Sequence, residues 1–104
     1  MKGNKMNAFF TLHKEISNIE KETSELKKLI GNNNLSEEEK QRIFKWGNTV
    51  RSMMNMVGID EKTQEDFNKL FKSFTEKLSW LISITEGVLP IFKTYYEEKS
   101  HRPF

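Results

Sequence analysis

Apolar residues recur along most of this chain at alternating spacings of three and four positions. In the first third they are Phe9, Leu12, Ile16, Ile19, Leu26 and Ile30, and Thr23 occupies the one step without an apolar residue. This spacing returns side chains to one face of an α-helix, whereas a half-buried strand needs alternation at every second position. No segment shows strand alternation. The sequence therefore predicts an all-α fold, an antiparallel bundle of three or four long helices that forms a single domain over residues 1–104.

Turn and capping residues divide the apolar pattern into helices. A first helix is predicted over residues 4–30, because Gly31 follows it and can adopt the left-handed conformation that ends many helices. A capping box that starts at Ser36 opens a second helix, which is predicted to end at Val57, just before Gly58.

The last part of the chain leaves its helix boundaries open. A third helix is predicted to start at a cap formed by Asp60 or Thr63 and to carry one wide apolar stripe over residues 67–82. Further on, Pro90 lacks a backbone N–H and Gly87 weakens the helix just before it. Either the last helix kinks near these two residues, or it ends there and Pro90 opens a short fourth helix.

The two ends of the chain carry no strong helical pattern. Residues 1–4 and 100–104 are predicted to be flexible, the latter unless Phe104 docks on the domain.

Residues 78–96 are apolar around nearly the whole circumference of a helix. A second stripe, formed by Trp80, Ile84, Ile91 and Tyr95 at spacings of four, seven and four, lies apart from the stripe that would meet the other helices. Contiguous exposed apolar patches mark interaction surfaces, and aromatic rings are enriched in interface cores. We predict that these four residues bind a protein partner or a second copy of the chain. The alternative is that a short fourth helix folds back and buries them.

The sequence contains no recognisable pattern of catalytic or metal-binding residues. The chain has no Cys, its two histidines are far apart in sequence, and its five glycines are scattered rather than gathered in a phosphate-binding loop. We expect no catalytic residue, no metal, no cofactor and no small-molecule substrate.

Charged residues provide two other candidate sites. Glu86 lies between apolar runs and is a candidate switch or an anchor for an arginine of a partner; the alternative is that it simply points to water. A nucleic-acid contact would use basic residues of the second helix, namely Lys40, Arg42, Lys45 and Arg51. Because three glutamates directly precede them and the net charge is only +2, nucleic-acid binding is kept as an alternative function.

The sequence also bears on the cellular location. The longest uncharged run, residues 78–85, has eight residues, while a membrane-spanning helix needs about 20 apolar ones. No export or lipidation signal is present, so the expected location is the cytoplasm. The layout of a basic four-helix chain with a C-terminal tail is similar to that of bacteriocin immunity proteins, which implies a membrane-proximal alternative that acts through residues 78–92.

These observations lead to one expected function. We predict a small non-enzymatic interaction protein, a bacterial or phage regulator or inhibitor, that forms a homodimer or binds one protein partner through its last helix.

Overall fold

The computed structural model describes residues 2–104, with side chains described from Ala8 onward. Its elements are α1 (Lys2–Leu26), a short 3-10 turn η1 (Lys27–Leu29), α2 (Glu37–Val57), α3 (Glu61–Phe71) and α4 (Leu78–Ser100). The described residues contain no strand, which confirms the all-α prediction in a four-helix form. The prediction of a flexible end at residues 1–4 lies in part outside the described residues.

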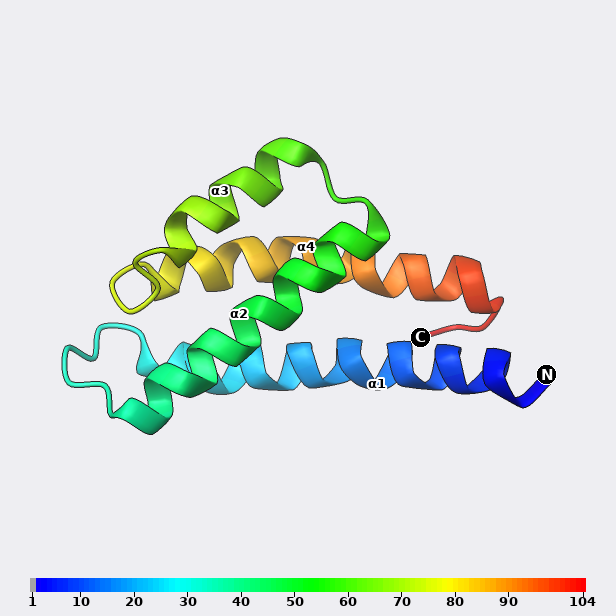
Figure 1. Ribbon diagram of the computed structural model, residues 1–104, viewed down its shortest axis with the longest axis horizontal. Coiled ribbons are helices and arrows are strands. Elements are labelled where there is room, and N and C mark those ends of the chain that lie inside the picture. The colour runs from blue at the N-terminus through cyan, green and yellow to red at the C-terminus, as the bar shows by residue number, and fades with distance from the viewer. Residues whose placement is uncertain (1) are drawn as a thin grey trace.

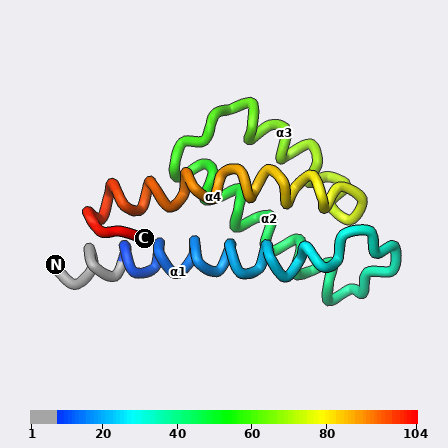
Figure 2. The backbone as a smooth tube through the Cα atoms, turned by 180° about the vertical axis from the view of Figure 1, so that it is seen from behind, coloured from blue at the N-terminus to red at the C-terminus, as the bar shows by residue number. Residues whose placement is uncertain are grey.

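The four helices form two layers. α1 and α4 lie side by side and run antiparallel, while α2 crosses over both of them (Figure 1). Seen from behind, α1 and α4 lie in front of α2 (Figure 2). α3 turns back from the end of α2 and runs antiparallel to the first part of α4 (Figure 1). Among the described helices, none covers Trp80 and Ile91 of α4, which are exposed.

The connection between α1 and α2 uses the residues that the sequence indicated. Gly31 has a φ of 84°, in the left-handed region. The Ser36 hydroxyl accepts a hydrogen bond from the Glu39 N–H at 3.0 Å, and the Glu39 carboxylate accepts one from the Ser36 N–H at 2.8 Å. The predicted capping box is therefore confirmed. α1 itself ends at Leu26, because η1 tightens its last turn before Gly31.

The boundary between α2 and α3 also follows the sequence. Gly58 has a φ of 76°, and the N–H of Ile59 donates to the carbonyl of Met54 at 2.9 Å, which is a Schellman ending. Of the two predicted caps for α3, Asp60 is the one used, since its carboxylate accepts from the Thr63 N–H at 3.0 Å.

The helical structure is interrupted between α3 and α4, where the sequence predicts a continuous helix. Residues 72–77 form turns, in which the N–H of Lys77 donates to the carbonyl of Ser73 at 2.9 Å. One continuous helix over residues 67–82 is therefore wrong. The turn brings the ring of Phe74 to 5.5 Å from Phe71 and 6.1 Å from Phe44, so that α3 packs against α2 by aromatic contacts.

α4 continues through Gly87 and Pro90 to Ser100 without interruption. The alternative in which the helix ends near Pro90 is therefore not found. Pro90 and Glu86 are both exposed. Water can thus satisfy the Glu86 carbonyl that the missing N–H of Pro90 leaves without its helical donor, which makes the proline tolerable here.

One core joins all four helices. Its fully buried apolar side chains include Ile16, Leu26, Ile43, Val50, Met53, Met54, Phe67, Leu81, Ile82 and Phe92. The indole of Trp46 is buried as well, and its N–H donates to the Thr23 hydroxyl at 2.9 Å. That hydroxyl donates in turn to the Ile19 carbonyl at 2.6 Å. Thr23 therefore stands in the apolar seam of α1 because it supplies the acceptor that a buried indole requires.

Gly47 sits where α3 meets α2. A Cβ at position 47 would lie 2.6 Å from Cζ of Phe71 and closer still to Cε1 of the same ring. The ring thus packs directly against the backbone of α2, and only glycine leaves it room.

The C-terminal tail returns to the domain. The ring of Phe104 stacks on the His13 imidazole with 4.2 Å between centroids. The backbone N–H of Phe104 donates a hydrogen bond to the Glu97 carboxylate at 2.9 Å. The His13 Nε2 atom lies 3.1 Å from the Phe104 carbonyl oxygen. Phe104 therefore docks on the domain, which is the case in which the sequence does not predict a flexible tail.

Candidate functional site

The four residues predicted to bind a partner, Trp80, Ile84, Ile91 and Tyr95, lie along one side of α4 and are called the α4 stripe below. Trp80 is 63% exposed and Ile91 is 48% exposed. Ile84 and Tyr95 are half-buried and pack against the edge of the core. The stripe therefore joins exposed anchors to side chains that the core holds in place.

The α4 stripe faces away from α1. One ion pair joins α1 to α4, Glu20 with Lys93 at 2.6 Å, and a second joins η1 to α4, Lys27 with Glu86 at 2.7 Å. Each of these α4 residues lies two positions after an isoleucine of the stripe, which is about 200° around a helix. α1 and the stripe are thus on opposite sides of α4.

An exposed glycine lies in the middle of the α4 stripe. Gly87 falls one turn after Ile84 and one turn before Ile91, and a Cβ added to it would meet nothing within 4 Å. Glycine inside a helix destabilises it by about 0.5–1 kcal/mol relative to alanine. No packing contact among the residues that the structure describes requires this glycine, in contrast to Gly47.

Glu86, the candidate switch, is exposed and lies in the ion pair with Lys27. It is not buried between the apolar runs, because its carboxylate faces Lys27 of η1 on the surface of the domain. The structure therefore places it in a surface contact between two helices.

The basic residues of α2 do not gather into one free surface. Arg42 donates two hydrogen bonds to the Glu22 carboxylate, at 2.7 and 3.2 Å, and this contact raises the pKa of the guanidinium above its ordinary value. Lys40 pairs with Glu37 at 3.3 Å.

The two remaining basic residues point in different directions. The guanidinium of Arg51 lies 5.3 Å from the centre of the Phe71 ring, on the side of α2 that meets α3. Lys45 lines a groove between α2 and α1 instead. Arg42 and Lys45 thus line the same groove, whereas Lys40 and Arg51 lie in other environments.

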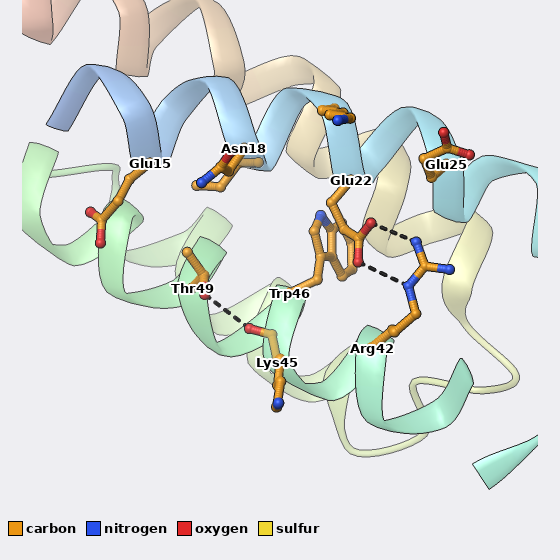
Figure 3. Close-up of a pocket in the computed structure, with 10 residues that line it drawn as sticks. Glu15, Asn18, Glu22, Glu25, Arg42, Lys45, Trp46 and Thr49 are labelled. Atoms are coloured by element: carbon orange, nitrogen blue, oxygen red, sulfur yellow. Dashed lines mark hydrogen bonds and ion pairs between the residues drawn. The ribbon is translucent and has the colours of Figure 1, made fainter. Parts of the chain in front are cut away.

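The groove between α1 and α2 was not foreseen from the sequence. It has a volume of about 750 Å³, and its wall brings Glu15, Glu22 and Glu25 of α1 together with Arg42 and Lys45 of α2. Figure 3 shows the Arg42 guanidinium facing the Glu22 carboxylate across this groove. Helical spacing alone does not give the angle between α1 and α2, so no sequence signal indicated it.

The chemistry of the groove is that of paired surface charges. Lys28 donates a hydrogen bond to Glu25 at 3.1 Å, which lowers the pKa of this carboxyl. The groove is open to water, and acidic and basic side chains face each other across it. Among the buried side chains that the structure describes, no polar atom lacks a hydrogen-bond partner.

Within the described residues, no three His, Cys, Asp or Glu side chains come together in a way that could hold a metal ion. None of the described helices combines the length and the apolar character that crossing a membrane demands.

No protein-family model matches the chain, and neither curated protein sequences nor solved structures give a significant match to it.

Proposed function

We propose that this protein is a non-enzymatic interaction module, a cytoplasmic regulator or inhibitor, whose contact surface is the α4 stripe. One observation carries this proposal. Trp80 is 63% exposed at the start of a stripe that runs on through the 48% exposed Ile91 and contains no charged residue. Single exposed apolar residues are normal on monomers, whereas a connected stripe of them marks a contact surface.

The composition of the stripe supports the same function. Trp and Tyr are the residues most enriched among those that dominate binding energy, and here they stand at the two ends of the stripe. Charged residues surround the ends, with Lys77 before Trp80 and Glu98 after Tyr95. An apolar centre with a polar rim is the usual layout of a specific protein interface.

The proposal is tested by placing charges in the stripe. We expect the double variant Trp80→Glu, Ile91→Glu to lose its partner or its self-association while it keeps the helical circular dichroism of the parent, because both side chains are exposed. Replacing Tyr95 is less informative, since its half-buried ring also supports the core. The measurement is the light-scattering mass of the purified chain beside affinity capture from a lysate.

Phe10→Glu provides the matched control. Phe10 is an aromatic residue of α1 that is 70% exposed and lies outside the stripe. This variant should behave like the parent in both assays. If Phe10→Glu and the stripe variant reduce binding equally, or if the stripe variant binds like the parent, the α4 stripe is not the contact surface.

A further inference from the structure

We infer that the α4 stripe is occupied by the α4 stripe of a second copy of this chain, packed antiparallel about a two-fold axis between Gly87 and Val88. This inference rests on the proposed function and names its partner. A two-fold interface uses the same patch on both copies, so the patch must be complementary to itself.

The α4 stripe has this self-complementary order. Trp80 stands seven positions before Gly87, and Tyr95 stands seven positions after Val88. Ile84 and Ile91 are likewise three positions from the same centre. In an antiparallel pair with this register, each Trp80 therefore faces a Tyr95 and each Ile84 faces an Ile91 of the other copy.

The charges that flank the stripe match in the same register. Lys77 lies ten positions before Gly87 and Glu98 ten positions after Val88, and both are exposed. Each Lys77 thus faces a Glu98 of the second copy, and this contact occurs twice. One position further out, Glu76 and Lys99 are related in the same way.

Within one copy, Lys77 and Glu98 are badly placed. Lys77 is the N-cap of α4 and makes no side-chain cap, and Glu98 lies in the last turn. The N-terminus of a helix favours negative charge and the C-terminus positive charge. An antiparallel second α4 places an opposite charge beside each of them.

The geometry of α4 permits the contact. The stripe is about 22 Å long, at about 1.5 Å per residue, and α1 lies on the opposite side of the helix. Gly87 at the centre allows the two backbones to approach closely, which gives the exposed glycine a role that packing within one copy does not. A contact between single helices is small, below about 1,200 Å² in total, so the dimer should dissociate on dilution.

Cysteine cross-linking tests the register on a clean background, because the chain contains no Cys. We expect Gly87→Cys to form a disulfide-linked dimer under mild oxidation, since the two copies of position 87 lie next to the axis. Thr94→Cys is the matched control, exposed on α4 but about 20 Å from its own counterpart in the antiparallel register. It should link at least about tenfold more slowly. Equal linking of both variants would indicate parallel helices, and failure of Gly87→Cys to link would also overturn the inference.

Charge reversal provides an independent test. Lys77→Glu and Glu98→Lys should each raise the dissociation constant of the dimer about tenfold at low salt, because each creates two like-charge contacts. The double variant Lys77→Glu, Glu98→Lys should return to within about twofold of the parent. Lys45→Glu, on α2, serves as the control and should leave the constant unchanged. A double variant that binds no better than the single ones overturns the register.

Self-pairing and the proposed function can fail separately. If the parent chain is a monomer at every concentration but Trp80→Glu, Ile91→Glu still abolishes capture of another protein, the second copy is not the partner and the stripe remains the contact surface. If the parent is a monomer and the stripe variant changes nothing, both fail.

Discussion

The buried hydrogen bond between Trp46 and Thr23 should contribute strongly to the stability of the fold. The Thr23→Val substitution keeps the shape of the side chain and removes the hydroxyl that accepts from the indole N–H at 2.9 Å. Both residues are buried, and only 4% of Trp46 is exposed, so water cannot replace the lost acceptor. The substitution therefore leaves an unsatisfied donor inside the core.

The loss of stability follows from the cost of leaving the indole N–H without an acceptor. A buried donor without a partner costs about 1–3 kcal/mol. The second bond of the hydroxyl, to the Ile19 carbonyl, contributes less, because this carbonyl belongs to the backbone ladder of α1. We expect Thr23→Val to lower the free energy of unfolding by about 2 kcal/mol. For a domain of this size the loss corresponds to a decrease in Tm of about 10 °C.

A double-mutant cycle with Trp46→Phe isolates the hydrogen bond from packing. Trp46→Phe removes the donor, so Thr23→Val should cost almost nothing in that background. The coupling energy from urea unfolding should then be about 1–2 kcal/mol. Thr23→Ser serves as the control, since it keeps the hydroxyl and should retain most of the coupling. If Thr23→Val is equally costly in both backgrounds, the indole and the hydroxyl do not interact as described.

Three further predictions concern single substitutions in the helices and are measured by thermal and urea unfolding. Ser36→Ala should destabilise the fold by about 1 kcal/mol, because it removes the cap of α2, and an unchanged Tm would mean that α2 begins elsewhere. Gly47→Ala should destabilise by about 1–2 kcal/mol despite the better helix propensity of alanine, since its methyl group must displace the Phe71 ring. Gly87→Ala is the matched comparison and should stabilise the monomer by about 0.5–1 kcal/mol, because its Cβ meets nothing; a loss of stability there would contradict the open space around it.

The parts of the fold that depend on local chemistry were predictable. The capping box at Ser36 and the left-handed Gly58 each satisfy backbone groups within a few residues, so neighbouring sequence letters are sufficient to place them. The position of Thr23 in the apolar seam of α1 was visible too. Its partner Trp46 was not, because a contact between residues 23 positions apart depends on how α1 and α2 cross.

The turn at residues 72–77 shows where apolar spacing fails. Apolar residues continue at helical spacing across this turn, so periodicity alone gives no sign of a break. Tertiary contacts decide it, since Phe71 needs the space at Gly47 and Phe74 joins Phe44. Similarly, the sequence offers Arg42 as a nucleic-acid contact because nothing local reveals that Glu22 of α1 binds it.

The extra helix bears directly on the argument for the α4 stripe. Because α3 is a separate helix, α4 has three neighbouring helices, whereas the sequence predicts two. This third neighbour could have covered the apolar side chains of α4 that α1 and α2 leave exposed. It does not cover Trp80 or Ile91, which stay exposed, and the aromatic contacts of Phe71 and Phe74 join it to α2. Of the two tryptophans, Trp46 is enclosed by the core while Trp80 stays exposed. Three helices therefore leave Trp80 and Ile91 exposed and Ile84 and Tyr95 half-buried, in a stripe with matching residues on either side of its centre, which is the property that pairing with a second copy requires.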